Sequence, residues 1–159
     1  MPTRVDSVRV SELPPDLARP LPPGRRALLV AEILAVYCQV RVRLARDRFP
    51  DALAAARRAP RRQSERDAIA ENGPTAVTYL RASRLARAVQ RTLRLVPADG
   101  RCLMQSLVLT ALLARRGIDT KLLIGVNQGG EFEAHAWVEY CGRALLPDSQ
   151  DEFHILAEL

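Results

Sequence analysis

The stretch that decides the fold is residues 102–117, Cys-Leu-Met-Gln-Ser-Leu-Val-Leu-Thr-Ala-Leu-Leu-Ala-Arg-Arg-Gly. Its middle is apolar almost all round, which predicts a helix that is central and buried. The two arginines and the glycine at its end suit a helix C-terminus, where cations favour the dipole and glycine forms the cap. The turn before it, Pro-Ala-Asp-Gly-Arg at residues 97–101, has to stop any earlier helix. The sequence therefore predicts a buried helix that begins at Cys102.

Three short strands are predicted after this helix. They are residues 120–126 (Thr-Lys-Leu-Leu-Ile-Gly-Val), 132–140 (Phe-Glu-Ala-His-Ala-Trp-Val-Glu-Tyr) and 144–146 (Ala-Leu-Leu). Short connections at residues 127–130 and 141–143 join them as an antiparallel meander. A helix followed by such a meander is an α+β arrangement. We therefore predict an α+β fold in which the buried helix packs on a small antiparallel sheet.

The rest of the chain divides into two regions of different composition. Residues 1–24 contain six prolines and no sustained period, which predicts a Pro-rich arm. Residues 25–96 are basic and contain two amphipathic helix patterns, over residues 25–48 and 75–95. We predict that this helical region packs on a core formed by residues 97–159.

Composition bounds the class of protein. With 159 residues, 48% of them hydrophobic, the chain is long enough for one well-formed core. The longest apolar candidate, residues 27–40, contains Glu32 and falls short of the roughly 20 residues that span a bilayer. The start lacks an apolar signal core, which predicts a cytoplasmic protein. The three cysteines, Cys38, Cys102 and Cys141, form no Cys-x-x-Cys pair, so we expect no disulfide framework and no structural zinc site. We also expect no other metal and no cofactor.

The net charge of +6 is spread unevenly along the chain. Residues 25–100 hold 16 arginines against seven acidic residues, whereas residues 101–159 are slightly acidic. Either a coding bias toward arginine or an acidic partner explains this. In the predicted helix over residues 75–95, arginines recur at steps of three and four, so they form either its solvated face or a docking surface. These residues are Arg81, Arg84, Arg87, Arg91 and Arg94.

Three residues suit the three roles of thiol catalysis. A helix N-terminus and a nearby imidazolium both favour the thiolate, and Cys102 is predicted at a helix start. His135 lies in the middle of a predicted strand, and Asp148 follows the next strand. A carboxylate on the far nitrogen of the imidazole would fix its tautomer and orientation. Asp151 competes with Asp148 for this third role, but it lies further along a less regular tail.

The neighbours of these residues suggest further contributions. In the strand over residues 132–140, His135 and Trp137 share one face, so Trp137 would lie beside the imidazole and could contact substrate. The amide of Cys102, free at the helix start, could donate to an oxyanion. Four polar residues could supply the second donor: Gln90, Gln105, Ser106 and Asn127.

Residues 101–148 carry a set of motifs that resembles a known family. They contain Cys-Leu-x-x-Ser-Leu-x-Leu, Leu-Leu-x-Arg-Arg-Gly-Ile, Leu-x-Ile-Gly-Val, Ala-His-Ala-Trp-Val-Glu and Gly-Arg-x-Leu. Together these resemble the transglutaminase-like leader peptidases of lasso-peptide biosynthesis, and most closely the stand-alone protease half of the split B protein. The Ala-His-Ala-Trp-Val-Glu motif alone would indicate only the wider transglutaminase-like superfamily.

The resemblance implies a cytosolic cysteine peptidase with a transglutaminase-like, papain-like catalytic core over residues 97–159. Such an enzyme cuts a ribosomally made precursor peptide between leader and core. By resemblance, Cys102 is the nucleophile, His135 the general base and then acid, and Asp148 the orienting carboxylate. The implied partners are the precursor, a small leader-recognition protein and an amidotransferase-like cyclase that closes the ring.

Two other classes of function compete with this interpretation. A transglutaminase-fold acyltransferase would form the same acyl-enzyme and pass the acyl group to an amine. A non-catalytic binding module would use its arginine helices to bind nucleic acid or an acidic protein. The Cys102, His135 and Asp148 set argues against the binding module, because a binder needs none of the three. We therefore expect a peptide substrate and no nucleic acid.

Overall fold

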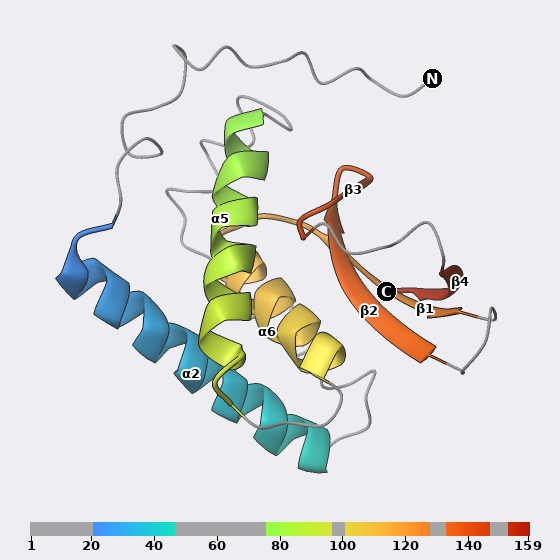
Figure 1. The fold of residues 1–159 in the computed structure, drawn as a ribbon, viewed down its shortest axis with the longest axis horizontal. Coiled ribbons are helices and arrows are strands. Elements are labelled where there is room, and N and C mark those ends of the chain that lie inside the picture. The colour runs from blue at the N-terminus through green and yellow to red at the C-terminus, as the bar shows by residue number, and fades with distance from the viewer. Residues whose placement is uncertain (1–20, 47–75, 97–100, 128–132, 147–152) are drawn as a thin grey trace.

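The computed structural model describes residues 21–46, 76–96, 101–127, 133–146 and 153–159. In these ranges the chain forms three helices and four strands (Figure 1). The helices are α2 (Pro23–Arg46), α5 (Ala76–Leu93) and α6 (Arg101–Arg115). The strands are β1 (Lys121–Asn127), β2 (Glu133–Tyr140), β3 (Arg143–Ala144) and β4 (His154–Glu158). The predicted α+β fold is confirmed.

Helix α6 is the centre of the structure. It packs against α2, α5, β1 and β2, and Figure 1 shows it between the other two helices and the sheet. Its residues from Ser106 to Ala114 are all buried, as the unbroken apolar run predicts. It ends in a Schellman motif: Gly117 has a φ of 72°, and Ile118 N–H donates to Leu113 O at 3.0 Å. The predicted glycine cap is therefore confirmed.

Helices α2 and α5 cover the side of α6 that faces away from the sheet. The buried residues of α2 include Ile33, Val36 and Val40, which belong to the predicted apolar stripe. Helix α2 begins at Pro23, two residues before the expected start, because proline is well tolerated in the first turn of a helix. Arg116, just after α6, forms an ion pair with Glu32 at 2.7 Å, which ties the end of α6 to α2.

The sheet is antiparallel, with strand order β3-β2-β1-β4. The sequence predicted the first two strands and placed the third at residues 144–146, whereas β3 is Arg143–Ala144. It did not predict β4, which pairs with the free side of β1. Residues Ile155 and Leu156 of β4 are 58% and 65% exposed, so this strand lacks the alternating burial that marks a strand in sequence. At one end of the sheet, an ion pair with Glu158 raises the pKa of Lys121.

Several expectations lie partly outside the described residues. The arm over residues 1–24 is described only from residue 21, and the boundary at residue 97 also falls outside the described parts. The division into arm, helical region and core therefore stays a prediction. Among the helices that the structure describes, none combines the length and the apolar character that crossing a membrane requires.

Because α6 holds the layers together, truncating its centre should be costly. Leu112 is fully buried, so Leu112→Ala should lower the free energy of unfolding by about 2–5 kcal/mol. The matched control is Leu28→Ala on α2, where the side chain is 72% exposed and the change should stay within about 0.5 kcal/mol. Urea denaturation of both variants measures the difference. Similar losses at the two positions would contradict the central place of α6.

Candidate active site

The candidate active site is built on one edge of β2. In an extended strand the carbonyls of alternate residues point to the same edge. Strand β3 covers this edge only along the last residues of β2. Just after β3, Leu145 N–H donates to Val138 O at 3.0 Å. The next two carbonyls on this edge, those of Ala136 and Ala134, precede the residues of β2 that pair with β3. Such edge carbonyls need other donors.

Two side chains of α6 approach these carbonyls. Ser106 Oγ donates to Ala136 O at 2.9 Å, and Cys102 Sγ lies 4.0 Å from Ala134 O. The spacing follows from elementary geometry, because four helical residues rise about 6 Å and two strand residues about 6.6 Å. The first two turns of α6 therefore run alongside β2 in register and take the place of a neighbouring strand. This register brings Cys102 to the segment of β2 that carries His135.

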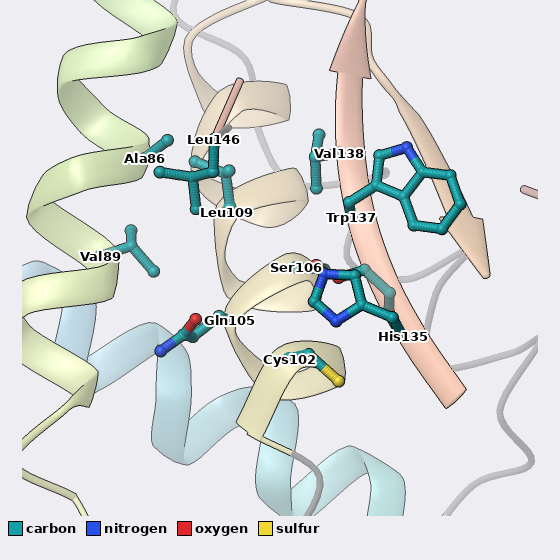
Figure 2. Close-up of a pocket in the computed structure, with 11 residues that line it drawn as sticks. Ala86, Val89, Cys102, Gln105, Ser106, Leu109, His135, Trp137, Val138 and Leu146 are labelled. Atoms are coloured by element: carbon teal, nitrogen blue, oxygen red, sulfur yellow. Dashed lines mark hydrogen bonds between the residues drawn. The ribbon is translucent and has the colours of Figure 1, made fainter. Parts of the chain in front are cut away.

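Cys102 and His135 line the same pocket, between the start of α6 and β2. The pocket holds about 380 Å³ of empty space, part of it open to solvent. Figure 2 shows the sulfur of Cys102 and, above it in this view, the imidazole of His135 at the same end of the pocket. Apolar side chains, among them Val89 of α5, Leu109 of α6 and Leu146, form the wall further from the sulfur.

Two aromatic rings hold the imidazole in place. The ring of Trp137 stacks with that of His135 at 6.1 Å between centroids, and the ring of Phe153 lies 5.3 Å away at a tilt of 35°. Trp137 is itself held by a hydrogen bond from its Nε1–H to Glu139 Oε1 at 3.0 Å. Sequence reasoning missed Phe153, because this residue precedes β4 and reaches His135 only through the pairing of β4 with β1.

Gly125 makes room for this arrangement. It pairs with His135 in the register between β1 and β2. A Cβ at position 125 would lie 3.0 Å from two ring carbons of Trp137 and 3.0 Å from the carbonyl oxygen of His154. The indole can therefore lie across β1 only because residue 125 has no side chain. A glycine inside a strand pattern is a signal of such close approach, so the sequence carried a hint of it.

The structure thus brings three of the predicted site residues, Cys102, His135 and Trp137, to one pocket. Asp148 and its competitor Asp151 lie outside the described residues. Among the proposed oxyanion donors, Gln105 lines the pocket. The Ser106 hydroxyl already donates a hydrogen bond to Ala136 O. Cys102 is the second residue of α6, so its amide is one of those that lack a partner within the helix.

The predicted arginine face lies on α5. Of the four predicted arginines that lie within α5, three are exposed and Arg84 is half-buried. None of these four described residues lines the pocket. The exposed three are Arg81, Arg87 and Arg91. The opposite side of α5 contributes Ala86 and Val89 to the pocket wall. Helix α5 therefore separates the arginines from the candidate site.

The comparison with known families agrees with this geometry. The family model described as Transglutaminase-like superfamily matches residues 34–158. The chain belongs to the transglutaminase-like superfamily. The match includes α5, α6, all four described strands and the second half of α2. No curated protein and no solved structure matches the chain closely enough to narrow this assignment.

Membership in the transglutaminase-like superfamily indicates cysteine protease or acyltransferase chemistry. Both reactions use a thiolate as nucleophile and a group that moves protons, usually histidine. The pocket that contains Cys102 and His135 provides both groups. Among the described residues, no cluster of three His, Cys, Asp or Glu side chains could hold a metal ion.

The arrangement around Gly125 can be tested by adding a single methyl group. Gly125→Ala should displace the indole of Trp137 and lower the free energy of unfolding by about 1–3 kcal/mol. Trp137 is the only tryptophan of the chain, so its fluorescence emission should shift and report the displacement directly. Gly24→Ala is the control, since nothing lies within 4 Å of its added Cβ. Unchanged emission in Gly125→Ala would contradict the close approach.

Proposed function

We propose that this chain is a cysteine peptidase that removes the leader peptide from a lasso-peptide precursor. The observation that supports it best is the shared pocket of Cys102, at the start of a buried helix, and His135, in the neighbouring strand. The motifs over residues 101–148 support the substrate class, because they resemble the leader peptidases of these pathways. Superfamily membership is consistent with cysteine protease chemistry.

In the proposed reaction, His135 accepts the thiol proton and the Cys102 sulfur attacks the last carbonyl carbon of the leader. The tetrahedral intermediate then collapses: the C–N bond breaks, and His135 donates the proton to the departing amine of the core peptide. Water, deprotonated by His135, attacks the thioester and releases the leader as a free acid. The core leaves with a free amine, which a later macrolactam closure requires.

Charge development in this reaction needs two further contributions. The amide of Cys102 is suited to donate to the oxyanion, and Gln105 is the second donor that the pocket favours. We propose Asp148 as the carboxylate that orients the imidazole, on the strength of its place in the family pattern. The rings of Trp137 and Phe153 restrict the same imidazole from other directions.

The acyltransferase alternative differs only in the second half of the reaction. Both enzymes would form a thioester on Cys102, and the acceptor, water or an amine, decides the product. Half-burial of Cys102 and the part of the pocket that is open to solvent are compatible with water as the acceptor. Product masses distinguish the two reactions, because only hydrolysis yields two fragments whose masses sum to that of the precursor plus one water.

Cleavage should depend on Cys102 and not on the other thiols. Incubation of the protein with a precursor and its leader-recognition protein, followed by mass spectrometry, should show the two hydrolytic fragments. Cys102→Ala should reduce the rate at least about 10³-fold, since it removes the nucleophile. The control Cys38→Ala alters an exposed thiol on α2 and should cleave normally. Cleavage by Cys102→Ala, or an intact precursor with the unaltered protein, would contradict the proposal.

We also propose that the arginine face of α5 binds the leader-recognition protein or the leader itself. Helix α5 has four arginines and no acidic residue, so its outer side is uniformly positive. A surface of this kind attracts acidic partners and strengthens binding most at low salt. It lies on the far side of α5 from the pocket wall, so a bound partner would leave Cys102 accessible.

Charge reversal tests this surface. The double variant Arg87→Glu/Arg91→Glu should weaken binding of the partner roughly tenfold at low salt, because two attractions become repulsions. Fluorescence anisotropy with labelled partner measures the affinity at two salt concentrations. The control is Arg25→Glu/Arg26→Glu, which makes the same change of charge at exposed positions of α2. An equal loss in both double variants would mean that only net charge matters, which would contradict a specific surface.

A further inference from the structure

Ser106 has a role that the reaction scheme above does not assign. Its side chain is buried, at 6% exposure, and its hydroxyl donates to Ala136 O at 2.9 Å. The Ala136 carbonyl belongs to the peptide unit between Ala136 and Trp137, so this hydrogen bond fixes the backbone of β2 one residue beyond His135. Ser106 also lies one helical turn after Cys102, on the side of α6 that faces β2.

The second contact between α6 and this edge cannot persist during catalysis. Cys102 Sγ lies 4.0 Å from Ala134 O, a distance at which only a neutral thiol can donate weakly. Once the thiol has given up its proton, sulfur carries negative charge and has no hydrogen to offer the carbonyl. The attraction at Ala134 is then lost at the moment when the position of the sulfur matters most.

We propose that Ser106 is a positioning residue for the nucleophile, an inference that deepens the proposed peptidase function and rests on it for its catalytic meaning. Its hydroxyl takes the place of the β3 strand at Ala136 and holds the start of α6 against β2 while Cys102 is ionised. The sulfur thereby stays beside His135 in the thiolate state. Because its hydroxyl donates to Ala136 O, Ser106 acts through that carbonyl and not on the substrate.

The chain offers a natural control for this role. Thr110 lies one turn beyond Ser106 in α6, is 2% exposed, and its hydroxyl has no hydrogen-bond partner among the described residues. Thr110→Val removes this hydroxyl with little change of shape. If Ser106 acts through its hydrogen bond and not through general packing of α6, the two positions should respond differently.

Alkylation of Cys102 by iodoacetamide measures the thiolate without any peptide substrate. The exposed cysteines are first replaced, Cys38→Ser and Cys141→Asn, the latter because asparagine accepts the φ of 52° at that position. The rate is recorded from about pH 5 to about pH 9, because the thiolate and not the thiol reacts with iodoacetamide. In this background Ser106→Ala should lose at least about tenfold of the rate near neutral pH, since a displacement of about 1 Å at a reacting group can cost about 10²-fold.

Two control variants show whether Ser106 acts through its hydrogen bond or through packing of α6. Thr110→Val should keep the rate and pH profile of the parent within about twofold, and Ser106→Thr, which retains the hydroxyl, should recover most of the lost rate. Parent-like alkylation by Ser106→Ala, or an equal loss in Thr110→Val, would overturn the proposal. If Ser106→Ala does not fold, Ser106→Thr decides: a rate as low as that of a His135→Ala variant would overturn it.

A double-mutant cycle separates this role from the proposed function. In a His135→Ala background, Ser106→Ala should have no further effect on the alkylation rate, because there is no imidazole for the sulfur to pair with. An additional loss there would overturn the positioning role. If Ser106→Ala slows alkylation only when His135 is present, and the unaltered protein cleaves no precursor, the role of Ser106 stands and the proposed peptidase function is rejected. If Ser106→Ala is alkylated normally and the unaltered protein does cleave the precursor, the positioning role of Ser106 is rejected and the peptidase function stands.

Discussion

The structure depends on the contact between the first two turns of α6 and the edge of β2 that β3 leaves uncovered. Ser106 donates to Ala136 O there, and Cys102 lies one turn earlier, against Ala134 O. Because the rise of four helical residues nearly equals that of two strand residues, a helix can occupy this edge in register. The match places a thiol at a helix N-terminus beside the one strand that carries a pocket histidine. The position of the candidate nucleophile follows from where the helix begins.

The two N-terminal helices make that contact possible. A helix that is buried from Ser106 to Ala114 has to be covered on every side, and a sheet of four short strands covers only one. Helices α2 and α5 supply the remaining cover, and α5 also lends Ala86 and Val89 to the pocket wall. The same helix presents its arginines outward. One element therefore serves the core, the pocket and a charged surface, and it connects the basic region with the candidate site.

Local sequence rules predicted the parts of the site that arise from local structure. The stop before Cys102, the cap at Gly117 and the shared face of His135 and Trp137 each follow from residues within a few positions of one another. The same rules missed β4 and Phe153, because the exposed residues of that strand carry no clear alternation. They also left Ser106 among several candidate oxyanion donors, since nothing nearby in sequence shows what its hydroxyl contacts.

The sequence by itself determined the fold class, the central helix and the superfamily-type pairing of a helix-start cysteine with a strand histidine. These features depend on periodicity and on short motifs, which act over one or two turns of chain. Only the tertiary structure decided which donor meets each edge carbonyl of β2 and which rings enclose His135. Those contacts join residues about 30 positions apart, as Ser106 and Ala136 are, and their partners are selected by packing of whole elements against one another.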